Sequence, residues 1–111
     1  MSYLILTNKI RNNELTNEEL VECLEINNVT ILKYTILKLI ERQIKSDHVK
    51  DKLLIYSHYF DMRYKILGMC KLGHLSIYAL KKLGYDDEFQ NEYSKLDEYE
   101  KNQIKLLNES L

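Results

Sequence analysis

One pair of side chains in this 111-residue chain has a spacing that could support nucleophilic catalysis. Cys70 and His74 are four residues apart, so on a helix they would share a face, and a thiol beside an imidazole is the beginning of a nucleophilic site. A buried thiol and a histidine at a helix end, where positive charge is favoured, explain the same spacing. We favour this second explanation, expect no catalytic residue and interpret the chain as a protein without enzymatic activity.

Two further groupings have spacings that resemble ligand sites. Asp47, His48 and Asp51 would lie on one helix face, where carboxylate and imidazole groups could hold a metal ion. Asp47 also stands where a helix would begin, and the helical motifs His-Glu-x-x-His and Glu-x-x-His are absent from the sequence. Gly68 and Gly73 have the glycine spacing of a phosphate-binding loop, but a histidine occupies the position of its lysine. We therefore expect no metal and no cofactor.

The cysteines and the N-terminus indicate where the protein works. Cys23 and Cys70 lie far apart within apolar helical patterns, and buried free thiols behave there as small hydrophobic groups. The apolar run at residues 3–6 is too short for a signal sequence or a membrane span. We expect reduced cysteines, a cytoplasmic location and no membrane partner.

Charge is distributed unevenly along the chain, although the net charge is −1. Residues 45–84 contain eight Lys or Arg and three Asp or Glu, whereas residues 85–111 contain three and eight. A basic segment of this kind is typical of nucleic-acid binding, and it would act here through four side chains: Lys65, Lys71, Lys81 and Lys82. The adjoining acidic segment would repel phosphates, so nucleic acid is the alternative partner and another protein is the favoured one.

The fold class follows from turn residues and periodicity. The chain contains no proline and only three glycines, whereas a β-sandwich or barrel needs many tight turns. Apolar residues recur with the helical period of 3.6 in several segments. We expect an all-α domain whose helices begin at or just after seven places: Thr16, Asn28, Ser46, Asp61, Leu75, Asp86 and Asp97. The first dozen residues fit either a helix or a strand.

An internal repeat suggests how these helices are arranged. A shift of 30 residues places residues 32–40 on 62–70, with Tyr34 on Tyr64. A period near 30 is typical of an α-solenoid, in which successive helix pairs stack.

Residues 46–84 resemble a short bacterial HEAT repeat. Asp61 would cap the second helix, Arg63 would follow in its first turn, and Leu72 and Gly73 would end it. The resemblance implies a small α-α superhelix of antiparallel helix pairs over residues 16–84. Residues 1–15 form an N-terminal segment of uncertain structure, and residues 85–111 form an acidic C-terminal cap. A plain helical bundle is the alternative fold.

The resemblance also indicates a binding surface, because the second helix of each HEAT pair lines the inner face. Two tyrosines and several bases would form stacked rows there, and we predict six partner-binding residues: Tyr34, Lys38, Arg42, Arg63, Tyr64 and Lys71. The opposing interpretation is that the tyrosines pack between helices. We interpret the chain as a protein-binding module, such as a small inhibitor, antagonist or immunity-type protein. We expect the aromatic face of residues 85–96 to pack in the core; if it is exposed, it would form a second docking element or the contact of a homodimer.

Overall fold

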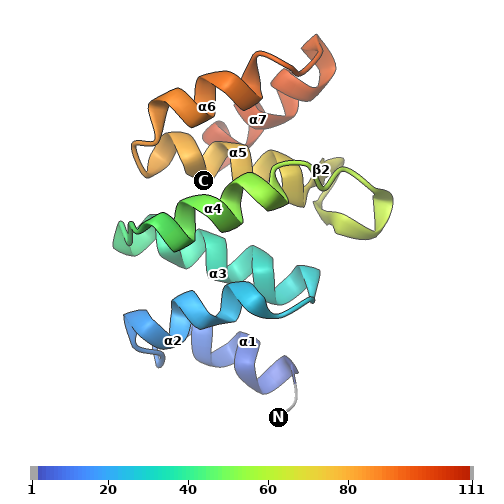
Figure 1. The fold of residues 1–111 in the computed structure, drawn as a ribbon. Helices are drawn as coiled ribbons and strands as arrows, with labels where there is room; N and C mark the ends of the chain where they lie inside the picture. Colours follow the sequence, from blue (N-terminus) through green and yellow to red (C-terminus); the bar gives the residue numbers. More distant parts are fainter. Residues whose placement is uncertain (1–2, 111) are drawn as a thin grey trace.

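The computed structural model describes residues 3–110, which are mostly helical (Figure 1). The helices are α1 (Tyr3–Arg11), α2 (Asn17–Glu22), α3 (Val29–Arg42), α4 (Asp47–Tyr56), α5 (Leu72–Lys82), α6 (Asp86–Tyr93) and α7 (Glu98–Ser110). Two 3-10 turns, η1 (Cys23–Glu25) and η2 (Met62–Tyr64), and one antiparallel hairpin of strands β1 (Lys65–Leu67) and β2 (Cys70–Lys71) complete the described elements. The all-α fold expected from the sequence is confirmed.

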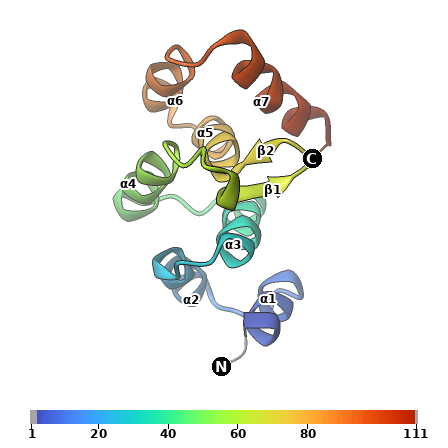
Figure 2. The same cartoon turned by 90° about the vertical axis from the view of Figure 1, so that its right-hand side faces the viewer.

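The helices stack in two layers. Helix α1 packs on α3 and α3 packs on α5, so these three form one layer. Helices α2, α4 and α6 form the other layer, and each follows its partner in the first layer along the chain (Figures 1 and 2). Helix α7 covers the remaining side of α5. The stack is elongated, with principal extents of 39 × 27 × 23 Å.

Side-chain caps fix most of the expected helix starts. Thr16 accepts a hydrogen bond from the Glu19 backbone at 3.1 Å, and Glu19 accepts one from the Thr16 backbone at 2.9 Å. Asn28, Ser46 and Asp97 each accept one from the backbone N–H three residues later. Such caps satisfy backbone donors that would otherwise have no intrahelical partner. The N-terminal segment is also settled, because residues 3–11 form helix α1 and not a strand.

The prediction of a helix after Asp61 is wrong. The Asp61 carboxylate accepts a hydrogen bond from the Arg63 backbone at 3.2 Å, but the cap starts only the 3-10 turn η2. Residues 65–71 then form the hairpin, which turns at Gly68 with a positive φ of 54°. Gly73, expected to end a helix, lies in the first turn of α5. The 30-residue alignment of 32–40 with 62–70 therefore matches a helix with a turn and a hairpin.

Burial of α5 explains this difference. Every residue from Leu72 to Leu80 is buried, and a helix that is apolar on all sides belongs at the centre of a fold. The close approach of Gly73 to Phe60 requires a glycine, since a Cβ on Gly73 would lie 2.8 Å from Cζ of the ring. The most apolar stretch forms the central helix α5. Residues 62–71 therefore form the connection that leads into the N-terminal end of this helix.

Candidate protein-binding surface

The hairpin and the 3-10 turn before it project beside the stack of helices (Figure 1). Met62, Leu67 and Met69 are 59%, 52% and 48% exposed. Arg63 and Lys65 lie between them in the sequence and are also exposed. We call these five residues together with Tyr64 the hairpin surface. Flexible methionines and arginine are side chains that protein interfaces use often.

A buried histidine holds the base of the hairpin. The Nδ1 atom of His74 accepts a hydrogen bond from the Lys71 backbone N–H at 2.9 Å. Its Nε2 atom therefore carries the hydrogen, which it donates to the carboxylate of Glu100 on α7. Burial lowers the pKa of His74, so the imidazole is neutral at pH 7. The hairpin consequently rests on a fixed contact between α5 and α7.

Cys70 and His74 do not act on each other. The Cys70 sulfur donates toward Gln103, at 3.4 Å from Oε1 and 3.6 Å from the backbone oxygen. Burial raises the pKa of this thiol, which keeps it protonated and a poor nucleophile. His74 is fully buried at the start of α5, and not at the helix end where its spacing had placed it. Both groups are used to attach the hairpin and α7 to α5.

Tyrosines line the side of the hairpin surface that faces the helices. The Tyr64 ring packs on Tyr59 with centroids 4.6 Å apart, and Arg63 lies 5.2 Å from the Tyr64 centroid. On α3, Tyr34 is half-buried and lies under two cations, Arg11 at 5.2 Å and Lys33 at 4.9 Å. A cleft of about 70 Å³ separates Lys33 and Tyr34 on α3 from Lys65 and Ile66 on β1.

The structure separates the six predicted binding residues. Arg63 and Tyr64 belong to the hairpin surface, and Tyr34 borders it across the cleft. Lys38 instead pairs with Glu41 at 2.6 Å. The six residues therefore do not form the stacked rows that the repeat suggested.

The other two predicted residues have structural contacts. Arg42 donates to the Leu15 carbonyl at 3.0 Å and to Asn17 and Asn13 at 3.1 and 3.3 Å, which joins α3 to the loop between α1 and α2. Lys71 is 8% exposed at the base of the hairpin. Neither side chain lies on the hairpin surface.

Sequence reasoning missed three members of the surface, Met62, Leu67 and Met69, and considered Lys65 only for the nucleic-acid alternative. In the sequence, Tyr64, Lys65 and Ile66 alternate between apolar and polar just before the turn at Gly68. Period-two alternation before a turn residue is a hairpin signal. Two apolar residues flanking Gly68 were the available sign of an exposed turn.

The basic segment does not form one surface. Lys71 is buried, and Lys65 lies at the opposite end of α5 from Lys81 and Lys82. Charge follows the layers of the fold instead. The layer of α1, α3 and α5 contains one acid, Glu41, and the bases Lys9, Arg11, Lys33, Lys38, Arg42, Lys81 and Lys82. The other layer contains Lys50 and Lys52 with the acids Glu18, Glu19, Glu22, Asp47, Asp51, Asp86, Asp87, Glu88 and Glu92. The hairpin surface continues the basic side.

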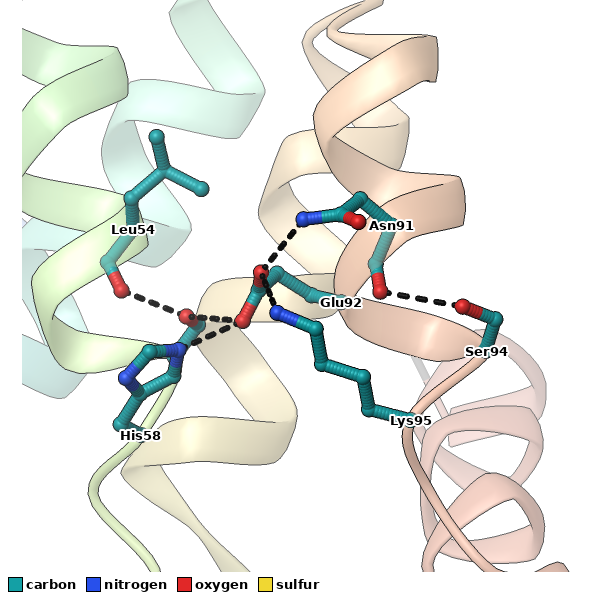
Figure 3. A network of polar contacts seen from close by, with 7 residues as sticks. Leu54, His58, Asn91, Glu92, Ser94 and Lys95 are labelled. Carbon is teal, nitrogen blue, oxygen red and sulfur yellow. Dashed lines mark hydrogen bonds and ion pairs between the residues drawn. The ribbon is translucent and has the colours of Figure 1, made fainter.

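A second polar cluster surrounds the buried carboxylate of Glu92 on α6 (Figure 3). His58 Nε2 lies 2.6 Å from Glu92 Oε1, and Lys95 and Asn91 donate to Oε2 at 3.2 and 3.1 Å. Burial raises the pKa of Glu92, but the bonds from His58 and Lys95 outweigh it and lower the pKa overall. The ionised carboxylate thus ties the end of α4 to α6.

This cluster contains serine, histidine and glutamate without the geometry of a catalytic triad. The Ser57 hydroxyl donates to the Leu54 carbonyl and lies 3.4 Å from Glu92. In a triad the histidine would stand between the serine and the carboxylate. Here both Ser57 and His58 contact the carboxylate directly, so the contacts fit a link between helices.

Within residues 3–110, no three His, Cys, Asp or Glu side chains gather closely enough to hold a metal ion. Asp47, His48 and Asp51 share one helix, but His48 pairs with Glu25 at 2.9 Å. None of the described helices has the length and apolarity needed to cross a membrane.

These features define the class of the protein: a compact all-α domain of packed helix pairs with one inserted hairpin. Comparison of the chain with protein-family models, with curated proteins and with solved structures gives no match. The function must therefore be argued from the surface itself.

Proposed function

We propose that this chain is a non-enzymatic protein-binding module that docks an acidic partner protein through the hairpin surface. The observation that carries the proposal is the exposure of Met62, Leu67 and Met69 on a hairpin whose base is fixed. Several large apolar side chains exposed on one short segment can mark a protein interaction site. A hairpin fixed by buried contacts also loses little conformational entropy on binding.

Charge supports an acidic partner. Arg63 and Lys65 flank the apolar side chains, and Lys33 lies across the adjoining cleft. The acid of the hairpin region, Asp61, lies 3.8 Å from Arg63 and is itself exposed. Complementary charge around an apolar centre speeds association and fixes orientation, while the apolar centre supplies most of the affinity.

The arrangement of helices supports a short solenoid resembling HEAT proteins, with the hairpin in place of the helix expected at 62–70. A rigid stack of helix pairs can present an insertion at one side without changing its own packing. A module of 111 residues that covers the functional surface of its partner would act as an inhibitor or antagonist by occlusion.

Nucleic acid is the second candidate, because the hairpin surface is basic. The separation of Lys65 from Lys81 and Lys82 argues against it, since a phosphate backbone is bound by many bases in a continuous track. The exposed apolar side chains of Met62, Leu67 and Met69, which flank Arg63 and Lys65 in the sequence, also have no use in a phosphate-binding stripe.

Affinity capture from the native host, with and without nuclease, tests the proposal. The bait proteins are the wild type, the charge-reversed Arg63→Glu/Lys65→Glu protein and the Leu67→Ser/Met69→Ser protein. We expect a stoichiometric protein band that resists nuclease and is lost with either variant. The matched control is Lys81→Glu/Lys82→Glu, which reverses the same number of charges at the far end of α5 and should retain the band.

Three outcomes would contradict this proposal. Retention of nucleic acid alone would replace the protein partner by nucleic acid. Equal loss with both charge reversals would show that net charge, not the hairpin surface, governs binding. An unchanged band with Leu67→Ser/Met69→Ser, in protein that keeps its thermal transition, would remove the apolar side chains from the interface.

A further inference from the structure

A groove of about 410 Å³ opens between the C-terminal halves of α5, α6 and α7. It lies at the opposite end of α5 from the hairpin, so it is separate from the proposed protein-binding surface. Its lining includes the aromatic rings of Tyr78, Phe89 and Tyr93 together with Ile104. The volume falls within the range of small-molecule sites, near its lower end, and suits a ligand with one fused ring system.

The apolar wall of the groove is preformed. Tyr78, Phe89 and Ile104 are buried, and Phe89 stacks on Tyr93 with centroids 5.0 Å apart and planes inclined by 28°. A ligand ring packed against the edges of these rings would gain the edge-to-face contact that aromatic pairs also prefer. The groove therefore offers an apolar wall for a ring.

The charges around the groove select the sign of the ligand. Lys81 and Lys105 line it, against one carboxylate, Glu109. Lys82 and Lys101 do not line the groove, but their ammonium groups lie over the rings of Tyr78 and Tyr93, which do.

The aromatic faces themselves do not favour a cationic ligand. Ammonium groups already lie over them: Lys81 at 5.5 Å from the Phe89 centroid, Lys101 at 5.3 Å from Tyr93 and Lys82 at 5.6 Å from Tyr78. A second cation would have to displace these groups and would be repelled by them. An anion would instead be attracted by the lysines that line the groove.

Two amides complete the polar rim. The side chains of Gln90 and Asn108 border the groove and make no hydrogen bond to residues 3–110. Each can donate to an oxyanion and accept from a hydroxyl group. The groove thus combines an aromatic wall with several donors at its mouth, which is the usual composition of a small-molecule site.

We propose that this groove binds a small aromatic anion, with its ring against Phe89 and Tyr93 and its carboxylate or sulfonate between Lys81 and Lys105. The proposal is independent of the partner protein, because none of the groove residues belongs to the hairpin surface.

Titration with two fluorescent probes of similar shape tests the proposal. The anionic probe is 8-anilinonaphthalene-1-sulfonate, and the neutral one is N-phenyl-1-naphthylamine, which lacks the sulfonate. We expect the sulfonate to bind with one-to-one stoichiometry and about tenfold more tightly than the neutral probe, which corresponds to about 1.4 kcal/mol. Amide chemical shifts measured at saturation should change around Phe89, Tyr93 and Ile104.

Matched lysine variants separate the groove from general charge. Lys81→Gln/Lys105→Gln should weaken the sulfonate about tenfold and leave the neutral probe unchanged. Lys101→Gln removes a cation from a ring of the same groove without changing its lining, and should leave both affinities within about twofold. Equal binding of the two probes, equal losses in both lysine variants, or shift changes scattered over the molecule would each overturn the proposal.

Discussion

An exposed base lies over an aromatic ring at both ends of α5, but the two ends differ in the burial of their apolar side chains. At the hairpin surface, Leu67 and Met69 are exposed, and Arg63 lies over the half-buried Tyr64. At the groove, Phe89 is buried and an exposed lysine lies over it. Apolar atoms that lie outermost form a contact surface for a macromolecule, whereas apolar atoms beneath a rim of charges form a pocket. A base over an aromatic ring thus occurs in two settings, for which we propose two different kinds of binding.

The largest effect is expected when apolar side chains are shortened at each end of α5. Phe89→Ala should lower the free energy of unfolding by about 3 kcal/mol, because it leaves a cavity among buried side chains. Leu67→Ala should change it by less than about 0.5 kcal/mol, because the side chain is already in contact with water. Urea unfolding followed by circular dichroism measures both values. A loss of more than 1 kcal/mol for Leu67→Ala would mean that the tip is a packed part of the core.

The second test concerns the close contact between Gly73 and Phe60, at the point where the hairpin is followed by α5. Gly73→Ala should destabilise the protein by about 1–3 kcal/mol, because its Cβ would collide with the Phe60 ring, which packs edge-on against His74. Gly68→Ala is the control, since its Cβ would enter open space and cost only about 1 kcal/mol from the positive φ.

A double mutant shows whether the close approach of Gly73 to Phe60 causes the loss of stability. Phe60→Leu should recover part of the Gly73→Ala loss, so the two changes should be non-additive in unfolding experiments. Additive losses would remove the collision as the explanation.

Local signals predicted much of the fold because they act within one turn of helix. The cap at Thr16 and the polar break at Asn28 needed no knowledge of the tertiary structure. The prediction for the region after Asp61 was wrong because the periodicity of this region fits a helix, while its position depends on the burial of α5 by four other helices and strand β2. The burial of the more apolar segment at the centre of the fold outweighed the local helical pattern of the segment after Asp61.

The candidate site was predictable only in part for the same reason. Arg63 and Tyr64 were recognised by residue type, although through a repeat that the hairpin replaces. Lys38 and Lys71 were chosen for their basic side chains, but both are largely buried, and that burial depends on contacts between segments. The aromatic series on α6 was expected to be either core or interface. In the structure Phe89 is core, and Tyr93 borders a groove that α7 completes.

The third prediction concerns pH and the histidine beneath the hairpin. Burial lowers the pKa of His74 below its ordinary value of 6.5, and Glu100 and Lys71 are the charged groups that face it. The unfolded chain therefore binds more protons at this site below pH 6.5, so the contribution is fully present above that pH and is lost as the pH falls. Thermal unfolding between pH 7 and 5 should show this loss in the wild type.

A variant without the titrating group isolates the effect. His74→Gln keeps a side-chain acceptor near the Lys71 backbone but cannot titrate, so its stability should be flatter between pH 6.5 and 5. Below pH 4.5 both proteins should lose stability through Glu92, whose pKa is lowered overall. An equal slope for both proteins above pH 5 would assign the acid sensitivity to another group.

The smallest expected effects compare the same kind of contact, a cation over an aromatic ring, at the two ends of α5. Lys81→Gln removes a cation from the buried Phe89 ring and should cost about 0.5 kcal/mol of stability. Arg63→Gln removes one from the half-buried Tyr64 ring, where the guanidinium is 73% exposed, and should leave the free energy of unfolding unchanged within error. If binding of the partner protein falls with Arg63→Gln and persists with Lys81→Gln, the cation at the hairpin acts on the partner while the cation at the groove acts on the fold. Equal stability losses would instead mean that both cations serve internal packing, and the hairpin surface would then depend on Leu67 and Met69 alone.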